Sequence, residues 1–272
     1  MKVIAAINGS IAAESMAFYV LKYAQVQNLT LVLLHIENKK DNLDDVEASI
    51  KRITTLAYSQ DIKIESVFLH GLPKQAIKKF ISSVHVDTIF CSTRRNKKFT
   101  TDSFSELLIK INLNVDIAVV HIVNINNIMD LSNITLSINE DKLSVKKFTF
   151  FATLASAYKA DGEIYSLSSI SRQKLSIVDM HEARERLSAI NYNLKHYMKL
   201  ANLMSFNIHI KHDFTYDEAD SILMHIVKSN TNLVIVGAKR LSGTLFFKKE
   251  MPIEKLMREA SINIIAYYTN ED

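Results

Sequence analysis

Residues 2–10 read KVIAAINGS, and this stretch decides the fold class. A continuous apolar run that ends at Ile7 is typical of a strand buried on both faces of a sheet. Asn8 and Gly9 form the turn that follows, and Ser10 is placed to cap a helix over the apolar-periodic residues after it. A buried strand that turns directly into a helix predicts the first unit of a parallel α/β sheet.

The same alternation of strands and helices continues to residue 123. Further strands are expected at 29–36, 62–70, 87–92 and 116–122, and helices at 12–25, 43–59, 72–84 and 104–114. The first 123 residues therefore predict five parallel strands, with helices that cover both faces of the sheet.

The pattern then repeats after a polar, Asn-rich connector. Asn139 stands 131 positions after Asn8, and Gly237 stands 145 positions after Ser92. A polar insertion and a longer helix in the second half explain why the two offsets differ. This internal duplication predicts two similar units, residues 1–123 (the first half) and 133–272 (the second half), joined by the connector 124–132. The second half is expected to contain strands at 133–138, 162–169, 205–212, 232–237 and 262–268, and helices at 142–158, 179–204, 216–229 and 252–260.

Composition excludes several classes of protein. The chain has 272 residues, 48% of them hydrophobic, and its net charge of +4 is far below the dense basic character of a nucleic-acid-binding protein. The single cysteine, Cys91, lies in an apolar strand, so the chain carries no disulfide framework or CxxC site. The apolar start is too short for a signal peptide, and no run approaches the length of a membrane helix. We expect a cytoplasmic protein without membrane contact.

Six quoted segments resemble those of universal stress proteins that carry two domains in one chain: KVIAAINGS, LTLVLLHI, HGLPKQAI, DTIF, NLVIVG and IEKLMREASINIIAYY. Together they cover nearly the whole chain in the order of that family. The resemblance implies two repeated flavodoxin-like (Rossmann-like) units, each a five-stranded parallel sheet with helices on both faces. It also implies an intramolecular pseudo-dimer, whose best candidates for a seam are the closing strands 116–122 and 262–268.

The resemblance further implies where a nucleotide could bind. Nucleotide-binding members of the family hold ATP beside the first and fourth strands, at the point where the strand order reverses. Their signature is a glycine, two residues, a second glycine, nine residues and then Gly-Ser or Gly-Thr. In NTNLVIVGAKRLSGTLFFKKEMP, residues 230–252, Gly237 matches the first glycine and Gly243 a further one, but Arg240 replaces the second. Glu250 and Met251 replace the closing pair.

The first half departs from the signature in a different way. Ser92 and Arg95 replace the two glycines, while Ser103 can still supply the closing hydroxyl. The acidic residue that the family carries after its first strand is Asn8 here and Asn139 in the second half. Both nucleotide motifs are therefore predicted to be degenerate.

Three hypotheses of function follow, in order of preference. The first is a non-enzymatic stress-response protein that acts through an unidentified protein partner, either as one chain or as a homodimer. The second is a regulator that binds ATP or AMP, with Mg²⁺, in one half. The third is a weak ATPase, although no catalytic base can be named.

Two groups of residues are expected to be structural. His209 and His212 are three positions apart in a strand and so point to opposite faces, which excludes a shared metal ion. His35 and His121 end core strands. The aromatic run Phe148–Phe151 is expected in the core of the second half, and the alternative for part of this run is an interface.

Overall fold

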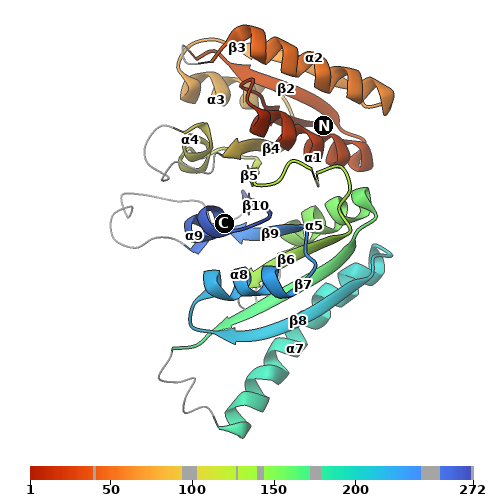
Figure 1. The fold of residues 1–272 in the computed structure, drawn as a ribbon, viewed down its shortest axis with the longest axis vertical. Helices are drawn as coiled ribbons and strands as arrows, with labels where there is room; N and C mark the ends of the chain where they lie inside the picture. Colours follow the sequence, from red (N-terminus) through yellow and green to blue (C-terminus); the bar gives the residue numbers. More distant parts are fainter. Residues whose placement is uncertain are drawn as a thin grey trace.

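The structure is a computed structural model that describes residues 1–38, 41–93, 103–126, 128–139, 144–171, 179–239 and 252–270. The described residues form an α/β fold around one ten-stranded sheet (Figure 1). The first half contains β1 (Lys2–Ala6), α1 (Ile11–Gln27), β2 (Thr30–Ile36), α2 (Leu43–Ser59), β3 (Ile64–Leu69), α3 (Pro73–Ser83), β4 (Val86–Thr93), α4 (Phe104–Lys110) and β5 (Asp116–His121). The predicted α/β class is confirmed.

The second half repeats this sequence of elements. It contains β6 (Asn133–Asn139), α5 (Val145–Tyr158), β7 (Asp161–Ser169), α7 (Met180–Leu203), β8 (Ile208–Thr215), α8 (Glu218–Lys228), β9 (Leu233–Ala238), α9 (Pro252–Glu259) and β10 (Asn263–Tyr268). The helix predicted at 43–59 coincides with α2, and the long helix predicted at 179–204 is α7.

Local sequence explains where helices begin. The Ser10 hydroxyl accepts a hydrogen bond from the backbone N–H of Ala13 at 3.3 Å, and Ser144 caps α5 in the same way from Lys147. Asp217 caps α8 by accepting from the N–H of Asp220 at 3.0 Å. Such caps satisfy N–H groups that the first turn of a helix leaves without a partner.

The strand order is β3-β2-β1-β4-β5-β10-β9-β6-β7-β8. Neighbouring strands are parallel except β5 and β10, which pair antiparallel with Ile264 opposite His121 and Tyr268 opposite Ile117. The two strands expected to form a seam are therefore hydrogen-bonded to one another in the middle of the sheet. Outward from this pair, both halves follow the same order, and in each half the first strand lies beside the fourth.

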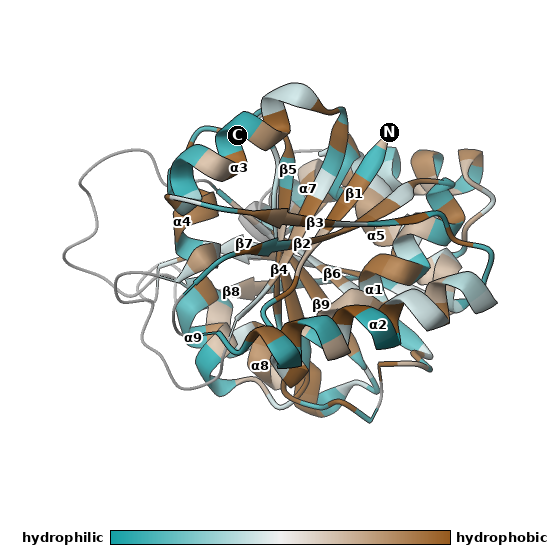
Figure 2. Ribbon diagram, turned by 90° about the horizontal axis from the view of Figure 1, so that it is seen from above, coloured by the Kyte–Doolittle hydropathy of each residue, from teal (hydrophilic) through white to brown (hydrophobic). Residues whose placement is uncertain are grey.

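The helices form a layer on each side of the sheet. Core contacts place α1, α2, α5 and α7 on one side of the sheet and α3, α4, α8 and α9 on the other. Figure 2 shows these helices around the apolar strands. The core under the first layer is continuous across both halves, because α1 packs against α5. The core under the second layer contains two clusters: one under α3 and α4, which extends into the second half through Met257 of α9 and Tyr268 of β10, and another under α8. The halves are thus joined through the sheet and through core contacts on both of its faces.

Aromatic side chains fill the joint between the halves. The Phe150 ring stacks on Tyr267 with centroids 4.1 Å apart, and it also contacts Tyr23 and Phe90 of the first half at 5.4 and 5.7 Å. Phe148 and Phe151 instead contact residues of their own half. The run predicted as core of the second half is therefore divided, because Phe150 lies at the interface between the halves.

Two asparagines hold the ends of the connector. Asn263, which is 2% exposed, accepts from the N–H groups of Val123 and Asn124 at 2.7 and 2.9 Å. Its amide nitrogen donates to the Tyr19 hydroxyl and the Asn124 carbonyl, both at 2.8 Å. Asn232 holds the other end at a half-buried position, where its side-chain oxygen accepts from the N–H groups of Ser132 and Asn133 and from the Ser132 hydroxyl.

None of the helices in the described residues is both long enough and apolar enough to cross a bilayer.

Candidate functional site

The candidate sites lie at the carboxyl ends of the strands, beside β1 and β4 in the first half and beside β6 and β9 in the second. In each half this is where the strand order reverses, since the connections from the first and fourth strands leave in opposite directions. Asn8, Ser92 and Ser103 occupy the first of these sites, and Asn139 and Gly237 occupy the second. Arg95, Arg240, Gly243, Glu250 and Met251 lie outside the described residues.

In the first half, the Asn8 side chain is part of the turn into α1. Its side-chain oxygen accepts from the backbone N–H of Ser10 at 3.1 Å and from the Ser10 hydroxyl at 2.7 Å. Gly9 adopts a φ of +74°, and a Cβ there would lie 2.9 Å from the backbone nitrogen of Val46 in α2. The turn is therefore fixed by its own hydrogen bonds and by close contact with α2. The side-chain oxygen of Asn8 therefore already accepts hydrogen bonds within the turn.

The other two described residues of this site behave differently. Ser92 is half-buried near the end of β4, where it pairs with Val120 of β5. The Ser103 hydroxyl accepts from the N–H of Glu106 at 3.2 Å and lies 3.0 Å from the hydroxyl of Ser105. Ser103 is thus the N-cap of α4, a seven-residue helix, and its oxygen already accepts one hydrogen bond.

Acidic side chains follow the strands of the first half. Glu14 in α1 accepts two hydrogen bonds from the Arg52 guanidinium, at 2.7 and 2.6 Å, and one from Ser49. The bond from Arg52 lowers the pKa of Glu14 despite partial burial. At the next strand, the Glu37 carboxylate lies 2.8 Å from Nδ1 of His70. The carboxylate of Glu14 is therefore already engaged by Arg52 and Ser49 within the fold.

In the second half, a lysine covers the one glycine that matches the family signature. A Cβ on Gly237 would lie 2.8 Å from Cδ of Lys147 and 3.5 Å from its Nζ. Lys147 lies in the first turn of α5, whose cap is Ser144. The space that a glycine keeps open above the end of β9 is therefore filled by the lysine side chain.

Asn139 and the start of α8 complete this second site. The amide nitrogen of Asn139 donates to the Glu218 carboxylate. Lys255 in α9 bridges the carboxylates of Asp217 and Asp220, at 3.2 and 2.6 Å. The N–H of Asp220 and then Lys255 lower the pKa of Asp217, so that this carboxyl stays ionised. Three carboxylates and two ammonium groups thus stand near the strand ends of the second half.

Sequence reasoning did not place Lys147 or Glu218 at the candidate site; the acidic pair Asp217 and Glu218 was explained by the start of its helix. The position of Lys147 could have been predicted from Ser144. Ser10 and Ser144 cap the first helix of each half, so Lys147, three residues after its cap, lies in the first turn of the helix that follows the first strand. The position of Glu218 could not have been predicted in this way, since its contact with Asn139 joins residues 79 positions apart.

Most of the histidines that the sequence singled out, and the cysteine, lie within the fold. Nδ1 of His35 lies 2.9 Å from the carbonyl oxygen of Ile7, and His121 is buried at the end of β5. His209 is exposed on β8, whereas Nδ1 of His212 lies 3.0 Å from the Ser166 hydroxyl. Cys91 is buried, which raises its pKa to about 12. Among the described residues, no group of histidine, cysteine and acidic side chains could hold a metal ion.

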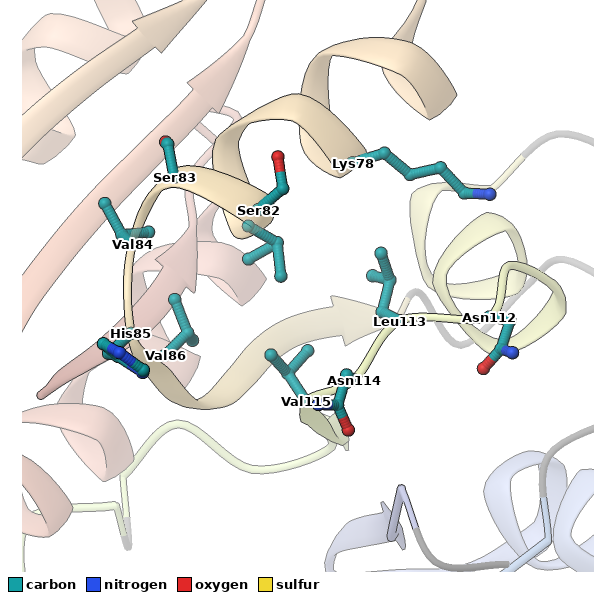
Figure 3. Close-up of a pocket in the computed structure, with 11 residues that line it drawn as sticks. Lys78, Ser82, Ser83, Val84, His85, Val86, Asn112, Leu113, Asn114 and Val115 are labelled. Atoms are coloured by element: carbon teal, nitrogen blue, oxygen red, sulfur yellow. The ribbon is translucent and has the colours of Figure 1, made fainter.

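A cleft of about 530 Å³ opens elsewhere, at the amino ends of β4 and β5 (Figure 3). It is lined by the end of α3 and by the loops before these two strands. Its charged or titratable lining residues are Lys78 and His85, and Figure 3 shows their side chains on opposite sides of the cleft. Because its polar groups do not converge, the cleft lacks the arrangement typical of a small-molecule site.

Comparison with solved structures gives matches over nearly the whole chain. A universal stress protein from Archaeoglobus fulgidus DSM 4304 is 14% identical, with 97% of each chain covered and a TM-score of 0.62. The chain has the universal stress protein fold. A putative universal stress protein from Pseudomonas aeruginosa UCBPP-PA14 is also 14% identical, with 99% of this chain and 94% of that chain covered and a TM-score of 0.60.

The same fold occurs in another setting. The cytoplasmic domain of a prokaryotic cation chloride cotransporter is 12% identical, with 100% of this chain and 96% of that chain covered and a TM-score of 0.61. No protein-family model and no curated protein matches the sequence. At such low identities the likeness establishes the fold, and function must be argued from the residues of the site.

Proposed function

We propose that this chain is a non-enzymatic, two-domain stress-response protein of the universal stress type, which acts through contacts with other proteins. The proposal includes a cytoplasmic location and a pairing of the two halves that imitates a dimer of single domains. One observation carries it: the side chain of Lys147 fills the space above Gly237, where a nucleotide phosphate would approach the backbone.

The neighbouring contacts support the same conclusion. Asn139 donates to Glu218, and the oxygen of Asn8 is used within its own turn. A nucleotide would have to displace these contacts before it could use the same groups. A phosphate placed about 4 Å from the carboxylate of Glu218 would also meet a repulsion of roughly 4 kcal/mol per unit charge at a surface dielectric.

The second candidate function is adenine-nucleotide binding, with ATP or AMP and Mg²⁺ held in the second half. Lys147 also favours this hypothesis in one respect, because its ammonium group already lies beside the end of β9. A lysine side chain is long and flexible, so it could turn from the glycine towards a phosphate. In that case the ammonium charge of Lys147 would compensate for the backbone contacts that the missing glycines would otherwise allow.

Titration calorimetry with ATP and AMP, with and without Mg²⁺, separates the two candidates. The scaffold proposal predicts no binding heat at millimolar nucleotide. A Kd tighter than about 10 µM, or roughly −7 kcal/mol, would overturn it in favour of the nucleotide regulator. If binding occurs, Lys147→Gln should weaken it at least tenfold. The matched control is Lys228→Gln, which removes the same charge from an exposed position at the far end of α8.

The weak ATPase remains the third hypothesis. It requires ATP turnover above the buffer rate that is lost on Ser103→Ala, since Ser103 offers the hydroxyl expected at the end of the first phosphate loop. The N-cap role of Ser103 requires a control for folding. Circular dichroism of the variant should therefore match that of the unchanged protein before a loss of turnover is attributed to the site.

A further inference from the structure

β8 forms one outer edge of the ten-stranded sheet and pairs only with β7 among the described strands. It is eight residues long and reads IHIKHDFT. Most strands of this sheet have a neighbour on each side, whereas β8 and the six-residue β3 at the opposite end have one. A long edge strand presents a row of backbone groups that can pair with another chain.

The hydrogen bonding of β8 shows which residues face outward. The carbonyl of Thr215 accepts from the N–H of Ile170 at 2.7 Å, so the backbone of Thr215 points towards β7. Backbone direction alternates along a strand, and in a parallel pair the N–H and C=O groups of one residue point the same way. The backbone groups of four residues therefore point away from the sheet: Ile208, Ile210, His212 and Phe214.

We propose that β8 pairs antiparallel with the β8 of a second copy of this chain, with His212 on the twofold axis. Pairing across such an axis is self-complementary, as a symmetric dimer requires. His212 would face the second copy's His212 as a hydrogen-bonded pair, and Ile210 would face Phe214 in the same way. This register uses all four outward-facing residues of β8.

The two charged residues of β8, Lys211 and Asp213, favour this register over registers shifted by one residue. Centred on His212, each Lys211 lies opposite the second copy's Asp213 in a non-hydrogen-bonded pair, where side chains approach most closely. A shift of the centre to position 211 would place lysine against lysine, and a shift to 213 would place aspartate against aspartate. Opposite charges directly across two strands stabilise the pair, and like charges destabilise it.

The side chains of β8 are positioned for this pairing. Lys211 is exposed, with Nζ 5.9 Å from the centre of the Tyr165 ring, and Asp213 is half-buried and accepts from the Tyr165 hydroxyl at 2.7 Å. Both charges therefore lie on one face of the sheet, over the same tyrosine. Next to the strand, Tyr216 is 53% exposed, and it would face Ile208 of the second copy.

The opposite edge of the sheet does not offer the same match. β3 reads IESVFL and contains one charged residue, Glu65, which forms an ion pair with Lys2 of β1. Without a basic residue in the strand, two copies of β3 cannot form the reciprocal ion pairs that β8 allows. The dimer is therefore expected at β8 rather than at β3.

Sedimentation equilibrium of the full chain, over protein concentrations from about 1 µM to 1 mM, tests the proposal. The apparent mass should rise with concentration towards twice that of one chain. Lys211→Asp should weaken the dimer at least tenfold, and Asp213→Lys should do the same. The double exchange, Lys211→Asp with Asp213→Lys, should restore association to within a few-fold, although it still lacks the bond from Asp213 to Tyr165. Glu65→Lys, at the other edge, should leave the association unchanged.

A cross-link gives a second readout that depends on the register itself. Residues in a hydrogen-bonded antiparallel pair have Cα atoms about 5.5 Å apart, within the range that a disulfide spans. The variant His212→Cys should therefore form a disulfide-linked dimer under mild oxidation. The native Cys91 is buried, so it should not compete in this reaction. Ser66→Cys, at an exposed position on β3, is the matched control and should stay monomeric. A monomer at every concentration, or a dimer that neither charge reversal weakens, would overturn the proposal.

Discussion

The substitution Asn263→Ala should destabilise the protein more than any ordinary surface change. Asn263 makes four hydrogen bonds while it is 2% exposed, and the Tyr19 hydroxyl that it contacts belongs to a fully buried residue. Each bond contributes about 1 kcal/mol net, and the cost rises when its partner is left buried without water. We therefore expect a loss of about 3–5 kcal/mol in the free energy of unfolding.

Asn232 provides a matched control within the same chain. Its side-chain oxygen accepts three hydrogen bonds at the other end of the connector, but at a half-buried position that water can reach. Water can replace a lost partner there, so Asn232→Ala should cost only about 1 kcal/mol. The two substitutions remove the same chemical group and differ mainly in burial.

Urea unfolding followed by far-UV circular dichroism measures both costs. The slope of free energy against urea should be the same in both variants and in the unchanged protein, so that the midpoints report stability. Equal losses in the two variants would refute the reasoning, because burial would then not decide the cost. A loss below about 1.5 kcal/mol for Asn263→Ala would refute it as well.

Three further predictions concern other parts of the fold. Gly162→Ala should lower stability by about 1–3 kcal/mol in thermal melts, because its Cβ would lie 2.3 Å from Cζ of Phe206. Cys91 should not react with a thiol reagent at pH 8 until the protein unfolds, because burial raises its pKa to about 12. The hydrogen bond from Arg52 lowers the pKa of Glu14 in the folded state, so this pair should stabilise the protein above about pH 4.5 and lose its effect as the pH falls through the lowered value. The free energy of unfolding, measured with urea at several pH values, should therefore fall less between about pH 5 and pH 3 in Arg52→Gln than in the unchanged protein.

The sequence predicted the elements better than it predicted their contacts. Continuous apolar runs marked the strands, because a strand covered on both faces has no polar side to interrupt the pattern. The bounds of α2 were predicted without error, since Asn42 and the acidic first turn mark its start clearly. The resemblance to two-domain universal stress proteins, rather than the duplication itself, indicated which strands meet at the centre of the sheet.

The contacts of the candidate site depend on side-chain directions that no pattern contains. Phe150 was expected in the core of the second half, but its direction from α5 carries it to Tyr267 at the joint. Lys147 covers Gly237 because the start of α5 happens to lie over the end of β9. Such juxtapositions follow from packing after the chain has folded, so residue types and spacing alone could not have shown them.

The central position of β10 has a consequence for how the protein is made on the ribosome. β5 pairs with β10 on one side, and all six residues of β5 are buried in the finished fold. A chain is synthesised from its N-terminus, and domains tend to fold as they emerge. Since β10 follows every other described strand, β5 is without that neighbour until residues 263–268 leave the exit tunnel. A stalled or truncated chain would therefore expose an apolar edge capable of pairing with other chains.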